Sequence, residues 1–313
     1  MVAQAVLKNS VVDWLWAQAT AYCTMAYLSS SSGDFAEAVS SFKKSAECYE
    51  AAGDRHRWAG VLNNQAIELN RMAEHAGRLG EPIEVIEASL EKAETAYRQA
   101  LEGLVELEVR NKPLEGRILL NMGKISETRG NWVEAGRRYT RAEETIVGLP
   151  LQGLFARIRL NLGIIHRKMG LLSEAAVLFR ETITRASTAG EPQIQALAMN
   201  HLAILNNDVD QIELSLEMLQ KAGGLDLMRI AIVDYGDILK QDAQKSLKVG
   251  DIEQTRRTLE RLQNLHRRLG HTVMAEKVAN AIQTIIEVTP PRIQFDLSDL
   301  FGELDFKEIA RAK

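Results

Sequence analysis

The stretch 121–142 reads NMGKISETRGNWVEAGRRYTRA, and it decides the fold because most of the chain repeats its pattern. Gly123 and Ala135 have so little bulk that two helices can cross closely at these positions. Trp132 and Tyr139 are large enough to fill the space on either side of such a crossing. The stretch therefore predicts one helical hairpin, with a helix before residue 130 and a second helix after it.

A tight turn between the two helices is encoded by Gly130 and Asn131. Glycine tolerates the left-handed conformation that closes a helix, and asparagine accepts a hydrogen bond from the first turn of the next helix. Glu134 stands three residues after Asn131, which is where the carboxylate of a capping box belongs. We therefore expect the second helix to begin directly after Asn131.

Steps of forty residues connect small residues in successive apolar helices: Ala26 and Ala66 form one series, and Gly123, Gly163, Ala203 and Ala243 form another. The fifty-seven residues between Ala66 and Gly123 indicate an insertion in the second repeat. We predict six repeats, with the fifth the most degenerate, at about 12–53, 54–112, 113–150, 151–192, 193–226 and 227–270. A capping helix at 272–288 is expected to cover the open end, using Val273, Val278, Ala281, Ile282 and Ile285.

This spacing of small and aromatic residues, over about 12–270, resembles the tetratricopeptide repeat. The forty-residue period is similar to that of kinesin light chains, the Leu-Gly-Asn polarity adaptors and the bacterial peptide-pheromone receptors. The resemblance implies an all-α, right-handed superhelical solenoid of antiparallel helix pairs. It also implies a concave groove that holds an extended peptide.

Composition narrows the classes of function. A net charge of -4 is too small in magnitude, and of the wrong sign, for a general nucleic-acid binder. Cys23 and Cys48 cannot supply a disulfide framework and are expected to be small buried hydrophobes. No apolar run is long enough for a membrane span, and Asp13 interrupts the segment that would have to be a signal-peptide core. We expect a cytoplasmic protein with one solenoid domain at 1–288.

The screen for catalytic and metal-binding motifs is negative. The chain has no P-loop, no Gly-x-Gly-x-x-Gly, no His-Glu-x-x-His and no Cys-x-x-Cys. His266 and His271 are five residues apart and do not share a helix face, and the loop after Asp208 and Asp210 lacks the glycine and glutamate of a calcium site. We therefore expect no enzyme activity, no cofactor and no metal.

A ladder of polar residues precedes the small residue of four first helices by two positions: Asn64, Asn121, Asn161 and His201. Asparagine is a poor helix former, so its recurrence calls for a reason. In the resembling families the equivalent asparagine faces the groove and bonds the backbone of a bound peptide. The alternative is that each asparagine bonds a neighbouring helix and only holds the repeats together.

Cations follow the ladder on the same helices: Arg117, Lys124, Arg157 and Arg167. They would make the middle of the groove basic and favour an acidic ligand. The predicted function is a non-enzymatic adaptor that binds an extended, acidic segment of a partner protein. A peptide-sensing regulator is the alternative, disfavoured because no effector module precedes the repeats, and an enzyme with an unrecognised site is the third class.

Two segments depart from the repeat pattern. The insertion predicts a second hairpin that is longer by about two turns in each helix, with Leu79, Ile83 and Ile86 near a tip at Gly80. The tail 289–313 alternates acidic and apolar residues after Pro290 and Pro291. The tail either packs on the last hairpin or is taken up by a partner, and both segments are candidates for self-association.

Overall fold

The computed structural model describes residues 2–105, 107, 110–268 and 272–287, and in these ranges all regular structure is helical. This confirms the predicted all-α class. The chain divides into two compact units, residues 1–178 and 179–313. Each unit is described by itself below. The prediction of one continuous solenoid domain, including its handedness, stays a prediction.

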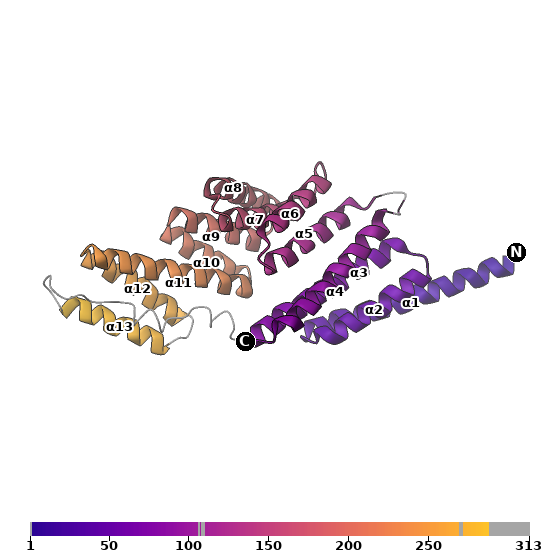
Figure 1. Ribbon diagram of the computed structural model, residues 1–313, viewed down its shortest axis with the longest axis horizontal. Helices are drawn as coiled ribbons and strands as arrows, with labels where there is room; N and C mark the ends of the chain where they lie inside the picture. Colours follow the sequence, from indigo (N-terminus) through magenta and orange to yellow (C-terminus); the bar gives the residue numbers. More distant parts are fainter. Residues whose placement is uncertain (1, 106, 108–109, 269–271, 288–313) are drawn as a thin grey trace. The chain divides into compact units, whose positions relative to one another are not determined.

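Unit 1 is a series of helical hairpins in which α1 pairs with α2, α3 with α4 and α5 with α6 (Figure 1). Its helices are α1 (Val2–Ser31), α2 (Phe35–Ala51), α3 (Arg55–Leu79), α4 (Ile83–Val105), α5 (Lys112–Thr128), α6 (Trp132–Ile146), α7 (Gln152–Lys168) and the first part of α8 (Leu172–Ala189). Successive hairpins stack through contacts of α2 with α3, α4 with α5 and α6 with α7. The bounds of the repeats predicted from the sequence stay a prediction.

The crossing of α5 and α6 depends on the absence of a side chain at Gly123. A Cβ atom built on Gly123 would lie 2.3 Å from Cε1 of Tyr139, which is far inside van der Waals contact. Tyr139 and Ala135 are fully buried, and Trp132 packs against the same cluster. The predicted register of the hairpin is therefore confirmed.

The turn between α5 and α6 follows the predicted chemistry in most respects. Gly130 has a φ of 72°, and the amide of Asn131 donates to the carbonyl of Ser126 at 2.8 Å, closing α5. The Asn131 side chain accepts from the amide of Glu134 at 3.2 Å. The Glu134 carboxylate bonds Arg138 at 2.9 Å, so the carboxylate half of the predicted capping box is replaced by an ion pair.

The second hairpin is longer than its neighbour, as the insertion predicts. Helix α3 has 25 residues and α4 has 23, against 17 in α5 and 15 in α6. At the tip Gly80 takes the left-handed conformation, while Leu79 and Ile83 are 60% and 67% exposed. Ile86 was expected to share their exposure, but it packs against the core of unit 1.

Within the described residues, unit 2 contains the second part of α8 and five further helices. These are α9 (Pro192–Asn206), α10 (Val209–Lys221), α11 (Leu225–Lys248), α12 (Ile252–Arg268) and α13 (Thr272–Glu287). Helix α13 packs on α12 and buries Val278, Ala281 and Ile285, as expected of a capping helix. Val273 was expected in the same contact, but it lies in the first turn of α13 and is 61% exposed.

Three predictions at the ends of elements need correction or fall outside the description. The first repeat was predicted to start at about residue 12, but α1 begins at Val2, ten residues earlier. Trp14 and Trp16 of this helix are exposed. The predictions for the tail 289–313 and for His271 lie outside the described residues.

Candidate functional site

Most predicted site residues lie on the first helices of the unit 1 hairpins, α1, α3, α5 and α7, which we call the A-helix layer. Asn64 is on α3, whereas α5 carries Arg117, Asn121 and Lys124 and α7 carries Arg157, Asn161 and Arg167. His201 is on α9 in unit 2. Its ring is 4% exposed and stacks on Phe179, with 5.2 Å between ring centroids.

A chain of amide hydrogen bonds links three helices of the A-helix layer. Asn121 donates from Nδ2 to Oδ1 of Asn63 at 3.2 Å, and Asn63 donates from Nδ2 to Oδ1 of Asn64 at the same distance. Asn64 then donates from Nδ2 to the hydroxyl of Tyr27 at 2.8 Å. The chain joins α5 to α3 and α3 to α1, so for Asn64 and Asn121 the geometry matches the bridging alternative.

Asn63 is a member of this chain that the sequence argument missed. Its side chain is 5% exposed, so its amide needs partners inside the protein. The Asn63-Asn64 pair in the sequence was a usable signal, because two adjacent asparagines in a helix are costly unless both are bonded.

Asn161 bonds a second-helix residue of the preceding hairpin. Its side chain hydrogen-bonds Tyr139, whose hydroxyl donates to Oε2 of Glu127 at 2.9 Å. Burial raises the pKa of Tyr139, Glu127 raises it further, and Asn161 opposes both. The third asparagine of the ladder therefore also contributes to contacts between helices.

The cations beside Asn121, unlike the asparagine amides, do not bridge neighbouring helices in the described ranges. Arg117 and Lys124 precede and follow Asn121 by about one turn, on the same side of α5, and both are exposed. Within the described part of the chain, no ion pair involves either of them. Their charges are therefore accessible to a ligand at the surface of α5.

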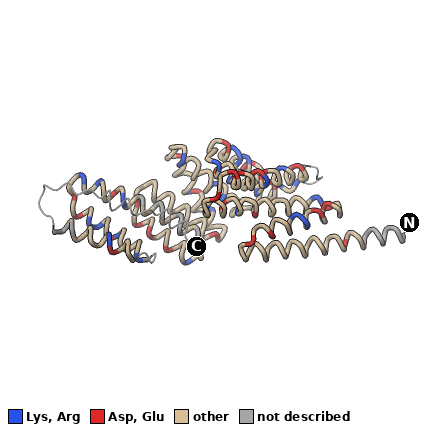
Figure 2. The backbone as a smooth tube through the Cα atoms, turned by 60° about the horizontal axis from the view of Figure 1, so that its bottom comes forward, with Lys and Arg blue, Asp and Glu red and all other residues tan. Residues whose placement is uncertain are grey.

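All formal charges on helix α7 are positive. It carries Arg157, Arg159, Arg167 and Lys168, and no Asp or Glu. Elsewhere in the chain, cationic and acidic residues are interspersed along the helices (Figure 2). Arg159 is paired with Glu143 of α6 at 2.6 Å. Lys168, eleven residues after Arg157, lies on the same face of α7 as Arg157 and Asn161. Arg167 lies about 100° around the helix from that face. Lys168 was missed because a forty-residue step from Lys124 reaches Ile164 instead.

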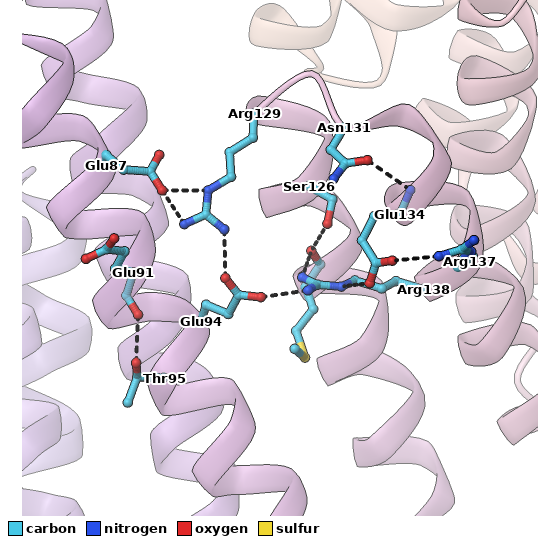
Figure 3. A network of polar contacts seen from close by, with 11 residues as sticks. Glu87, Glu91, Glu94, Thr95, Ser126, Arg129, Asn131, Glu134, Arg137 and Arg138 are labelled. Atoms are coloured by element: carbon cyan, nitrogen blue, oxygen red, sulfur yellow. Dashed lines mark hydrogen bonds and ion pairs between the residues drawn. The ribbon is translucent and has the colours of Figure 1, made fainter.

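Other cations of the α5–α6 hairpin are neutralised by the acidic helix α4 (Figure 3). Arg129 donates to Glu87 and to Glu94, both at 2.7 Å, and Arg138 donates to Glu94 at 2.6 Å. Burial by itself raises the pKa of Glu94, but the hydrogen bonds from the two guanidinium groups outweigh it and hold the pKa below its usual range. Arg129 and Arg138 thus hold the second and third hairpins together. Arg117 and Lys124 form no such contact with a described residue.

Comparisons with known proteins address the fold. A family model described as the tetratricopeptide repeat matches residues 155–189, which cover α7, the turn and α8. No curated protein matches the chain in sequence.

Among the described residues no group of three or more His, Cys, Asp or Glu side chains is placed to hold a metal ion. No helix in the described ranges combines the length and apolarity that a bilayer crossing requires.

Two solved structures show how far the architecture is shared. RapI in its apo form superposes with a TM-score of 0.57 at 9% identity, covering 86% of this chain and 98% of that one. Aspartyl phosphate phosphatase F from Bacillus subtilis superposes with a TM-score of 0.51 at 12% identity, covering 92% and 75%. At such identities the likeness concerns the fold alone. The chain is an all-α helical-repeat protein, and one tetratricopeptide repeat is recognisable in its own sequence at 155–189.

Proposed function

We propose that this chain is a non-enzymatic adaptor for protein-protein interaction, and that its A-helix layer in unit 1 binds an extended, acidic segment of a partner protein. The observation that carries the proposal is the charge of α5 and α7. Arg117 and Lys124 are exposed without an ion pair, and α7 has cations but no carboxylate. The cytoplasmic location predicted from the sequence is part of the proposal.

An acidic ligand fits this surface for electrostatic reasons. Carboxylates of the ligand would replace water around Arg117 and Lys124. Exposed opposite charges speed the encounter of two proteins more than they strengthen the complex. Binding should therefore weaken steeply as salt rises, because the interaction of exposed charges is screened over about 8 Å at physiological ionic strength.

Of the asparagines in the ladder, only Asn121 is given a specific role in ligand binding. Oδ1 of Asn121 accepts no hydrogen bond from a described residue, so it can receive a backbone N–H of an extended segment lying along α5. For Asn64, Asn161, Arg167 and His201 the role in ligand binding stays a prediction. The cations are therefore the residues to test first.

The test reverses the charge of the two unpaired cations of α5. The full chain with Arg117→Glu and Lys124→Glu is compared with the wild type in binding a fluorescent peptide of alternating Glu and Gly. A matched control carries Lys92→Glu and Arg98→Glu, which make the same change in net charge on the exposed side of α4. The first variant should lose binding by about a hundredfold, which corresponds to about 2.7 kcal/mol, and the control should keep it.

Two results would contradict the proposal. One is an equal loss in both variants, which would mean that only the net charge of the protein matters. The other is stronger binding of the corresponding Lys-Gly peptide by the wild type. Capture of partners from the source organism, followed by mass spectrometry, then identifies the natural segment, and the same two variants test it.

A further inference from the structure

The first helix of unit 1 exposes a row of apolar side chains although its other side is packed. Ala19 and Ala26 of α1 are fully buried toward the core. Val11, Trp14, Met25 and Leu28 lie elsewhere on the helix and are 56%, 59%, 47% and 66% exposed. Helix α1 also extends past the end of α2 toward the N-terminus (Figure 1). The side of a helix that faces away from the core of its protein is ordinarily polar, so this row requires an explanation.

The positions of the row alternate by three and four residues. Val11, Trp14, Gln18, Ala21, Met25 and Leu28 fall on one side of α1. This heptad spacing is the seam along which one helix packs lengthwise on another, here over about 26 Å. Asp13 is the one charged residue between Ser10 and Ser31, so α1 offers almost no charge that would repel an apolar partner.

When the row is paired with an antiparallel copy of itself, each side chain meets one that it can pack against. If two copies of α1 pack antiparallel about a twofold axis, Val11 of one copy faces Leu28 of the other, and Trp14 faces Met25. Gln18 faces Ala21 at the centre, where the small alanine lets the backbones approach. Trp14 meets a flexible thioether side chain, a contact that aromatic rings favour. Each position is thus paired with one that suits it.

We propose that the row on α1 binds the same row of a second copy, forming an antiparallel, twofold-symmetric homodimer. Such an isologous contact uses one surface patch twice, which is the commonest way in which soluble proteins form oligomers. The self-complementary order favours a second copy over an unrelated helix, because a row that binds an unrelated helix would not have to match its own antiparallel copy. The proposal does not depend on the ligand of the A-helix layer.

Light scattering on the full chain over a range of concentrations tests the proposal. The wild type should have the mass of a dimer. Trp14→Glu and Leu28→Glu should each raise the dissociation constant by at least about thirtyfold, because a charge then replaces an apolar contact of the seam. Thr24→Glu is the matched control, since Thr24 is exposed on the same helix outside the row, and it should leave the dimer intact. Circular dichroism checks that each variant keeps its helices.

Two further variants test the antiparallel register. Trp14→Glu combined with Met25→Lys in one chain should restore the dimer, because each new carboxylate then faces a new ammonium group of the other copy. Under mild oxidation a Val11→Cys chain mixed with a Leu28→Cys chain should form a cross-linked pair. The wild type serves as the control for Cys23 and Cys48, which are both half-buried.

The proposal is overturned by any of three results. The first is a monomer at every concentration, including one in which Trp14 is shielded by another part of the same chain. The second is a dimer that Trp14→Glu and Leu28→Glu leave unchanged, because the contact would then lie elsewhere. The third is a Val11→Cys chain that cross-links to itself but not to the Leu28→Cys chain, which would indicate parallel packing.

Discussion

Asn121 on α5 donates a hydrogen bond from Nδ2 to Oδ1 of Asn63 on α3 at 3.2 Å, and so ties the third hairpin to the second. Asn63 is buried, and its own Nδ2 is bonded to Asn64. Loss of the Asn121 amide would leave a buried acceptor without a partner. The asparagine ladder is therefore part of the contact between hairpins, whatever it contributes to a ligand.

Asn121→Ala should lower the free energy of unfolding by about 1 to 3 kcal/mol, because Oδ1 of Asn63 remains buried and unbonded. Lys124→Ala, an exposed change on the same helix, should have almost no effect. Urea melts of the two variants and the wild type check this. An unchanged midpoint for Asn121→Ala would show that water replaces the lost amide and that the ladder has little structural weight.

Gly123→Ala should destabilise the protein although alanine is the better helix former. The added Cβ would meet the buried ring of Tyr139 at 2.3 Å, and overpacking of this kind costs about 1 to 3 kcal/mol. Gly136→Ala is the control, because its Cβ would find Ile165 at an ordinary 3.7 Å and the change gains up to about 1 kcal/mol of helix propensity. Thermal melts should therefore move in opposite directions, and a parallel shift would contradict the crossing at Gly123.

Glu94→Gln should remove a contribution to stability that depends on pH. The pKa of Glu94 is held low in the folded protein, so its carboxylate stabilises the fold above the unfolded-state value of about 4.3, and this contribution disappears as the pH falls through the folded-state value. The wild type should have a higher melting temperature than the variant at pH 7. The two melting temperatures should converge once the pH is below the folded-state pKa of Glu94. Glu91→Gln on the same helix controls for the change in side chain, and curves that stay parallel down to acid pH would contradict the role of Glu94.

The tip of the second hairpin should tolerate polar residues. Leu79→Gln with Ile83→Gln should change the free energy of unfolding by less than about 0.5 kcal/mol, because both side chains are already exposed. Leu90→Ala on α4 should cost about 2 to 5 kcal/mol, because that side chain is buried. If the tip variant melts as low as Leu90→Ala, the tip is covered and belongs to the core.

The hairpins were predictable because their determinants are local in the sequence. Glycine before an N-cap residue, as at Gly130 and Asn131, marks a boundary by backbone geometry alone. The pairing of Gly123 with Tyr139 followed from the need to match a small residue with a large one. The same reasoning gave the length of the insertion and most of the capping surface of α13.

What failed depends on partners that lie far apart in sequence. Whether Ile86 is buried is decided by the side chains that pack against it and not by its own neighbours in the chain. The bond between Asn121 and Asn63 joins residues 58 positions apart, and the inserted residues between them hid the relation. Arg117 and Arg129 look alike in sequence, yet Arg129 faces the acidic helix α4 and Arg117 does not.

The second hairpin grew in both of its helices by the same amount, since α3 and α5 have 25 and 17 residues and α4 and α6 have 23 and 15. Equal growth leaves the paired faces of the hairpin in step, and the added turns all lie at the end away from the chain's entry and exit. A repeat can therefore be elongated during evolution without shifting its neighbours. Such an array can diversify by outgrowth of single hairpins as well as by duplication of whole ones.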